Sequence, residues 1–395
     1  MGTERGAFIK GILAAILVGI AGVLVVGLKP LLVTAYIEAD HLTPGKAGLL
    51  VALDMGGAML GNLLGSWRLY SLRRPRVAAV GLLMILVGNL GSLASVAFPA
   101  LAAARLITGF GAGVSASVMA AVLSSTRSPE RFFALYSFAA FMTSAGAMWL
   151  SGLMLRTHGP GLMFGGLATI TVLPLLTTAW LPSAPSVGAR RPGAPPVETR
   201  PAWRAGPGVV TLLLGTLLYY AITGGIYSFM AEMGLHRGIA ATAINDALAA
   251  AQVAAAIGSI VPFLLRDRLG RALPIVVTLL ISLGCLPAFL VSTSPLWIAT
   301  AMSAFAFAWL MFFPYLMGLC SALDSLGRLG TLDLAVQYAG LAVGPAAAGF
   351  IAEQAGYGVL IDGAAAGYLI ATALLLQANG RARRTPLVGV QHVHE

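Results

Sequence analysis

Long apolar runs alternate with short polar segments along almost the whole chain. A run of about 20 apolar residues can cross the hydrocarbon core of a bilayer as one helix. Prolines within several runs do not argue against helix, because membrane helices tolerate proline. We therefore predict an all-α membrane protein with twelve transmembrane helices, at residues 8–37, 44–66, 77–98, 99–122, 132–155, 160–181, 208–233, 240–265, 274–293, 296–320, 331–352 and 357–378.

The pattern breaks near the middle of the chain, at residues 182–206. This segment is rich in Pro, Ala and Arg and is typical of a linker. The halves on either side echo each other: Gly61 and Gly258 precede basic loops, and Pro99 and Pro295 open equivalent helices. Such internal symmetry is typical of transporters whose solute site lies between repeats. We predict pseudo-symmetric six-helix bundles at 1–181 and 207–380, the linker at 182–206, and a cytoplasmic tail at 381–395.

Composition and charge support a membrane protein. Hydrophobic residues make up 58% of the 395 residues and charged residues 10%, with a mean hydropathy of +0.89. That leaves too little polar surface for a soluble globule. The net charge of +10 comes from Arg and Lys concentrated in alternate loops, which is the positive-inside pattern. We therefore expect a bacterial inner membrane protein with both termini in the cytoplasm, and no role in nucleic-acid binding.

Three charged residues lie inside the apolar runs: Lys29, Asp54 and Arg105. A charge at bilayer depth is costly and by default marks a functional site. Counted from the helix ends, all three lie at similar depth, so a Lys29–Asp54 pair is sterically reasonable. We predict that Lys29 and Arg105 bind a substrate anion. The alternatives are a purely structural ion pair and an Arg105 that bonds only to carbonyls of the first helix.

A carboxylate beside a buried cation also suits proton coupling. When the cation moves away or binds an anion, the carboxylate loses a partner and takes up a proton more readily. Asp54 is the first candidate for this proton site, and Asp246 in the eighth span is the second.

The C-terminal half lacks such a charged cluster and carries aromatic and amide residues instead. We predict that these line the other side of a substrate cavity. The alternative is that the aromatic stripes face lipid or serve packing. The predicted residues are Tyr220, Tyr227, Gln252, Trp309, Phe313, Gln337 and Tyr338.

Two motifs resemble those of the major facilitator superfamily. Arg105, Gly109 and Gly111 resemble its R-x-x-x-G-x-G motif in the fourth helix, and the loop at 266–271 resembles its D-R-x-G-R signature. The resemblance implies the major facilitator fold and a gating role for Asp267, Arg268, Gly270 and Arg271. The equivalent N-terminal loop departs from the signature, with Gly65 where the family has Asp. A G-x-x-x-G-P pattern, typical of drug antiporters in the fifth helix, stands instead in the eleventh span at 340–345.

No metallopeptidase, serine-hydrolase, dithiol or P-loop motif occurs, so we predict neither an enzyme nor an ATP-driven pump. The two cysteines lack metal-ligand spacing, so no metal site is predicted. We expect a monomeric secondary transporter that moves a small organic anion, such as an aromatic or amphipathic carboxylate, by alternating access. Its partners are the solute, protons and the bilayer, and it needs no cofactor beyond a proton gradient. The alternatives are a proton-driven exporter of amphipathic drugs or metabolites, and a transporter-like receptor or sensor.

Overall fold

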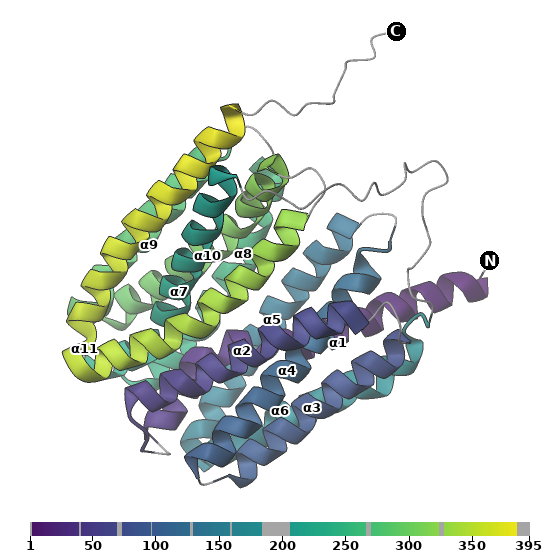
Figure 1. The fold of residues 1–395 in the computed structure, drawn as a ribbon. Helices are drawn as coiled ribbons and strands as arrows, with labels where there is room; N and C mark the ends of the chain where they lie inside the picture. The colour runs from purple at the N-terminus through teal and green to yellow at the C-terminus, as the bar shows by residue number, and fades with distance from the viewer. Residues whose placement is uncertain are drawn as a thin grey trace.

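The computed structural model describes residues 2–38, 41–68, 73–95, 97–126, 129–158, 160–183, 206–265, 270–323 and 328–384. The regular elements in these ranges are all helices (Figure 1). They are α1 (Gly2–Glu38), α2 (Pro44–Arg68), α3 (Arg74–Ala94), α4 (Phe98–Leu123), α5 (Pro129–His158), α6 (Pro160–Thr177), the short 3₁₀ helix η1 (Thr178–Trp180), α7 (Pro207–His236), α8 (Ala241–Leu265), α9 (Ala272–Val291), α10 (Pro295–Leu323) and α11 (Arg328–Arg384).

Each of the first ten predicted spans coincides with one helix, and within the described residues eleven helices are long and apolar enough to cross a membrane. The last two predicted spans both lie in α11, whose apolar stretch Leu332–Ala382 has 51 residues. A straight helix of that length would measure about 75 Å, against a hydrocarbon core of about 30 Å. The backbone leaves helical geometry at Gly356, with φ of 83°, and there α11 turns back (Figure 1). The twelfth crossing stays a prediction.

The helices form two groups that follow the chain. Helices α1–α6 pack mainly on one another, as do α7–α11, and the groups meet where α1 packs on α7, α2 on α11 and α5 on α8. The beginning of α1 and the end of α11 lie on one side of the molecule (Figure 1). We call this the terminal side, and the opposite side, with the α1–α2 and α7–α8 connections and Gly356, the far side. The linker and tail lie almost wholly outside the described residues.

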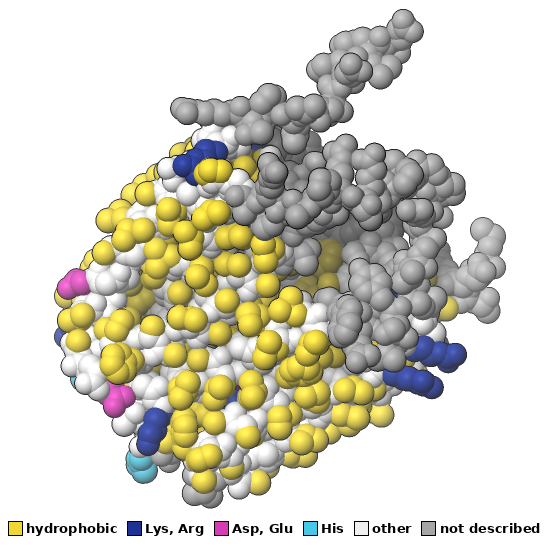
Figure 2. All heavy atoms as spheres, in the orientation of Figure 1, with side chains coloured by type: hydrophobic (Ala, Val, Ile, Leu, Met, Phe, Trp, Pro, Cys, Tyr) yellow, Lys and Arg dark blue, Asp and Glu magenta, His cyan; other side chains and the backbone are white. Residues whose placement is uncertain are grey.

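The outer surface is apolar over most of its area. Large side chains such as Val87, Leu173, Leu280 and Leu296 are more than half exposed on the outward faces of α3, α6, α9 and α10. In Figure 2 the hydrophobic atoms form a broad belt, while the coloured charged groups lie mainly near its edges. Apolar surface on this scale suits contact with lipid, so the chain is a multi-span membrane protein.

Glycines set the closest helix contacts. A Cβ on Gly109 of α4 would overlap the carbonyl oxygen of Asp54 in α2, and one on Gly113 would overlap that of Ala58. Only glycine permits this backbone approach. Gly109 lies one helical turn after Arg105 in α4, so its contact with Asp54 brings Asp54 close to Arg105. In α11, Gly344 of the G-x-x-x-G-P pattern likewise packs on the carbonyl oxygen of Ala221 in α7.

Candidate functional site

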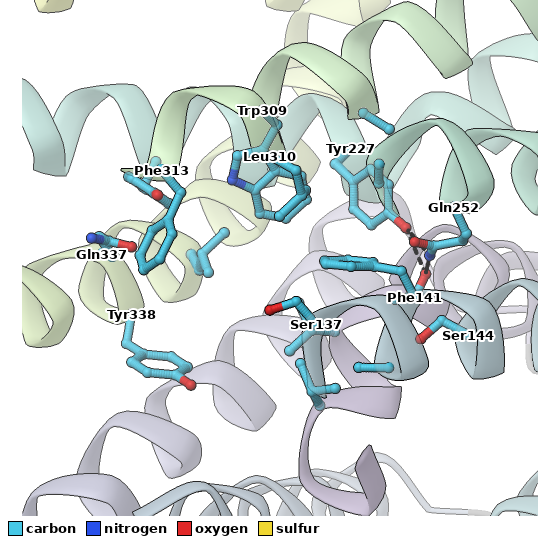
Figure 3. A pocket seen from close by; sticks show the side chains of 18 of the residues that line it. Ser137, Phe141, Ser144, Tyr227, Gln252, Trp309, Leu310, Phe313, Gln337 and Tyr338 are labelled. Atoms are coloured by element: carbon cyan, nitrogen blue, oxygen red, sulfur yellow. Dashed lines mark hydrogen bonds between the residues drawn. The ribbon is translucent and has the colours of Figure 1, made fainter. Parts of the chain in front are cut away.

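A partly enclosed cavity of about 260 Å³ lies between the two groups of helices (Figure 3). Each contributing helix presents one face to it, as the i, i+3, i+4, i+7 spacing of its lining residues shows. From α10 these are Ala306, Trp309, Leu310 and Phe313; from α11 they are Leu334, Gln337, Tyr338 and Leu341. The lining residues of α5 are Tyr136, Ser137, Ala140, Phe141 and Ser144, and those of α1 are Val23, Val26 and Gly27.

The cavity wall is aromatic and amide-rich. All seven C-terminal residues predicted to bind substrate line it, and among its lining residues none carries a charge. Sequence reasoning missed the α1 and α5 residues. In α5 the signal was present, because Tyr136, Ser137, Phe141 and Ser144 share one helical face, the same spacing that drew attention to α10. In α1 the lining residues Val23, Val26 and Gly27 carry no chemical signal.

On the far side, hydrogen bonds between the two groups form the floor of the cavity. The Tyr227 hydroxyl donates to the carbonyl oxygen of Gly27 at 2.6 Å, and the Gln252 amide donates to the same oxygen at 2.9 Å. Gln252 also donates to the Tyr227 hydroxyl at 2.8 Å (Figure 3). Pro30, one turn further along α1, provides no backbone N–H to the helix. The floor therefore joins α1, α7 and α8 at a weakened point of α1.

Beyond this floor the two groups touch directly. A Cβ on Gly48 of α2 would overlap the Pro345 carbonyl oxygen in α11, and one on Gly349 would overlap that of Pro44. The Glu353 carboxylate accepts a hydrogen bond of 2.9 Å from the backbone N–H of Gly45, in the first turn of α2. A carboxylate at a helix N-terminus is favourable because the free N–H groups there carry partial positive charge. The far side is therefore closed by backbone packing between α2 and α11.

The charged cluster lies inside the N-terminal group and not in the cavity wall. Arg105 is fully buried, and its Nε donates to the Ser92 hydroxyl at 3.0 Å. One terminal nitrogen donates to Asn89 at 2.8 Å and to Thr108 at 3.0 Å, and the other pairs with Asp54 at 3.5 Å. The Phe164 ring lies 5.1 Å from the guanidinium carbon. Side chains of α2, α3, α4 and α6 thus surround Arg105, in contrast to the alternative in which it bonds only to carbonyls of α1.

The predicted Lys29–Asp54 ion pair is wrong in this structure, since the ion pair of Asp54 forms with Arg105. The Lys29 ammonium is fully buried and has no hydrogen-bond partner among the described residues, and the same holds for Oδ1 of Asp54. The two opposite charges attract each other without a direct contact. Arg105 forms the ion pair with Asp54 because the close packing of α2 on the glycines of α4 brings Asp54 toward Arg105. Lys29 is thus the unsatisfied cation of the cluster.

The remaining predicted residues that the structure describes do not line the cavity. Asp246 is exposed on α8. Asp267 and Arg268 lie outside the described residues, so their gating role stays a prediction. Gly270 has φ of 59°, in the left-handed region that glycine adopts readily. Arg271 lies against Gly318 of α10.

Comparisons with known proteins agree with this architecture. A mutant of the nucleoside transporter NupG is 12% identical with a TM-score of 0.75, over 94% of this chain and 99% of that chain. A structure described as giving insight into substrate recognition in proton dependent oligopeptide transporters is 12% identical with a TM-score of 0.73, over 96% and 100%. A mutant of the peptide transporter POT in complex with sulfate is 15% identical with a TM-score of 0.72, over 94% and 95%. These identities show a common fold and no more.

A search of curated protein sequences finds no significant match. The family model described as Major Facilitator Superfamily, however, matches residues 11–332. Because this match covers more than half of the chain, the protein belongs to the major facilitator superfamily.

Proposed function

We propose that this protein is a secondary active transporter that carries an aromatic or amphipathic solute by alternating access. The observation that carries the proposal is the cavity between the two groups of helices, closed on the far side by the α2–α11 contact. A site between pseudo-symmetric halves, with one side sealed, suits a mechanism in which the halves rock about the solute. We place α11 across the membrane twice, turning at Gly356, which gives twelve crossings in two six-helix bundles.

The chemistry of the cavity wall supports the solute class. Trp309, Phe313 and Tyr338 offer flat apolar faces, while Gln252 and Gln337 offer amide groups that donate and accept hydrogen bonds. Such a wall fits a solute with an aromatic body and a few polar groups. A proton-driven exporter of amphipathic compounds would use the same wall, and the absence of charge from the lining residues favours this second candidate as well.

The charge of the solute depends on Lys29. In this conformation Lys29 lies two residues beyond Gly27 along α1, on the far side of the cavity floor. We propose that an organic anion, if transported, meets the Lys29 ammonium when the floor opens, because that ammonium is buried without a hydrogen-bond partner. Arg105 then serves to position Asp54, which carries the coupling proton.

We infer from the basic loops that the terminal side faces the cytoplasm, and from the closed far side that this conformation faces inward. Cysteine labelling measures this orientation. A cysteine replacing Lys46, on the far side, should react with an impermeant reagent in intact cells, and one replacing Ser183 should be protected. The reverse pattern would contradict the orientation.

The function is tested by uptake into proteoliposomes with an imposed pH gradient. The solute panel contains aromatic carboxylates, nucleosides, short peptides and amphipathic cations. For a solute that accumulates, Trp309→Leu should weaken binding about tenfold through loss of stacking, while Trp297→Leu, on the exposed lipid face of the same helix, should leave binding unchanged. Lys29→Met should weaken binding of anions alone. Binding without accumulation for every panel member would favour a receptor and contradict transport.

A further inference from the structure

A second buried carboxylate, Asp333, lies in the C-terminal group on α11. Its side chain is fully buried. The Thr216 hydroxyl of α7 donates to its Oδ1 at 2.8 Å, and the Gln337 amide nitrogen donates to its Oδ2 at 2.8 Å. The Cys320 thiol of α10 lies near it. Asp333 is thus held by neutral donors from two helices, α7 and α11.

Among the side chains that the structure describes, no cation pairs with Asp333. The titratable groups that face it are Tyr220 of α7 and Cys320 of α10, both uncharged when protonated. Arg271, which lies against Gly318 of α10, makes no ion pair with it. A buried carboxylate without a cation is costly, and hydrogen bonds from neutral donors offset only part of that cost. This environment contrasts with that of Asp54, which is paired with Arg105.

Asp333 contacts a residue of the cavity wall. Gln337 is the next residue on the same face of α11, four positions later, and it lines the cavity. An ionised carboxylate only accepts hydrogen bonds, so it selects the –NH₂ edge of the amide. The carbonyl oxygen of Gln337 is left on the Phe313 side of the cavity wall (Figure 3). In this state the wall presents an acceptor at Gln337.

Protonation of Asp333 reverses this selection. A proton bound to Oδ2 makes that oxygen a donor, which pairs with the carbonyl oxygen of Gln337 once the amide has rotated. The –NH₂ edge then faces the cavity and offers a donor in place of an acceptor. No other bond forms or breaks, and the proton comes from the aqueous phase at the terminal side, where α7 and α11 begin.

We propose that Asp333 is a proton-binding site whose charge decides which edge of the Gln337 amide faces the cavity. Asp333 is then a positioning residue that acts through Gln337, separate from the Asp54 cluster. The inference rests on the proposed function in taking the cavity as the solute site. Proton binding on the terminal side would change the hydrogen-bonding preference of that site for its solute.

Infrared difference spectra between acidic and neutral pH test the proposal on the reconstituted full-length protein without solute. We expect a protonated-carboxyl band together with a change in a side-chain amide carbonyl band. Asp333→Asn should remove the amide signal and the part of the carboxyl band that belongs to Asp333, while the part that belongs to Asp54 remains. Asp54→Asn should leave the amide signal and the Asp333 part of the carboxyl band in place. Asp362→Asn, which replaces an exposed carboxylate on the same helix, should leave both signals unchanged.

Gln337→Met supplies an independent test if Asp333→Asn does not fold. It should abolish the amide signal and shift the carboxyl band, because Asp333 loses one partner. An amide signal that persists in Asp333→Asn, a carboxyl band that this variant leaves unchanged, or a carboxyl band that is unshifted in Gln337→Met overturns the proposal. Since no solute is present, failure of the transport panel would leave this result standing, and failure here would leave the proposed function standing.

Discussion

Arg105 holds Asp54 with one terminal nitrogen while its other N–H groups bind the neutral side chains Ser92, Asn89 and Thr108. The planar guanidinium is suited to this task because it fixes several donors in one geometry. In this conformation Arg105 therefore positions the buried Asp54 carboxylate and neutralises its charge. This differs from the role of substrate ligand that the sequence predicted for it, which stays a prediction for other conformations.

We expect Arg105→Lys to lower the free energy of unfolding by about 1–3 kcal/mol, because a lysine ammonium cannot reach all of these acceptors and leaves some unsatisfied. Thermal unfolding in detergent measures this loss. The matched control is Arg76→Lys on the exposed face of α3, which should change stability by less than about 0.5 kcal/mol. Equal stability of the two variants would show that the buried bonds contribute little.

Asp54→Asn should abolish accumulation driven by a pH difference while retaining solute binding and exchange. The amide resembles the protonated carboxyl group in shape and charge, so the variant stays in one protonation state. Uptake and counterflow in proteoliposomes measure the two activities, with Asp362→Asn as the control for loss of an acidic residue. If Asp54→Asn still accumulates solute against its gradient, the coupling proton binds elsewhere, and Asp246 and Asp333 become the residues to examine.

At the scale of residues, the sequence predicted the buried charged residues and the cavity-lining residues of the C-terminal half. It did not predict which buried charges form the ion pair. Lys29, Asp54 and Arg105 can be identified from the sequence alone, because a charged side chain inside a membrane span carries a high free-energy cost. The choice between Lys29 and Arg105 as the partner of Asp54 depends on how closely α2 approaches α4, which sequence spacing along one helix does not encode. The Gln337–Asp333 contact could have been predicted, since i and i+4 lie on one helical face.

At the scale of elements, apolar runs predicted the helices well because each must satisfy its backbone internally within the bilayer. The exception is α11, where two predicted spans form one element that turns at Gly356. The glycine motifs of α4 and α11 have a structural role at this scale. Gly109 in α4 and Gly344 in α11 are the places where a neighbouring helix backbone comes closest, so these glycines set the geometry of α2 on α4 and of α7 on α11.

Gly109→Ala tests this role. The added methyl group would overlap the Asp54 carbonyl oxygen, so α2 must move away from α4, at a cost of about 1–3 kcal/mol. The Asp54–Arg105 distance should lengthen and gradient-driven uptake should fall. Gly363→Ala in α11 meets open space and is expected to raise stability by about 0.5–1 kcal/mol. Thermal unfolding of both variants checks the sign of each change, and a neutral Gly109→Ala would contradict the packing argument.

At the scale of the whole molecule, the two groups touch on the far side, and the cavity lies between them on the terminal side of that contact. The far-side contacts are backbone packing of α2 on α11 and the Glu353 carboxylate at the first turn of α2. Alternating access requires these contacts to separate, because the solute must reach the far side. The hydrogen bonds of Tyr227 and Gln252 to Gly27 must break in the same movement.

Cross-linking the far side should therefore stop transport without stopping binding. Gly45→Cys and Glu353→Cys place two thiols where the backbone N–H of one residue now meets the carboxylate of the other. In a Cys285→Ala, Cys320→Ala background, a short bis-methanethiosulfonate, which forms a disulfide with each of the two thiols, should join α2 to α11. Uptake should then fall to background, binding from the terminal side should remain, and a reductant that cleaves the link should restore uptake. Each single cysteine serves as the control. Full uptake by the cross-linked protein would mean that the solute passes without opening the far side, which would exclude alternating access by separation of α2 from α11.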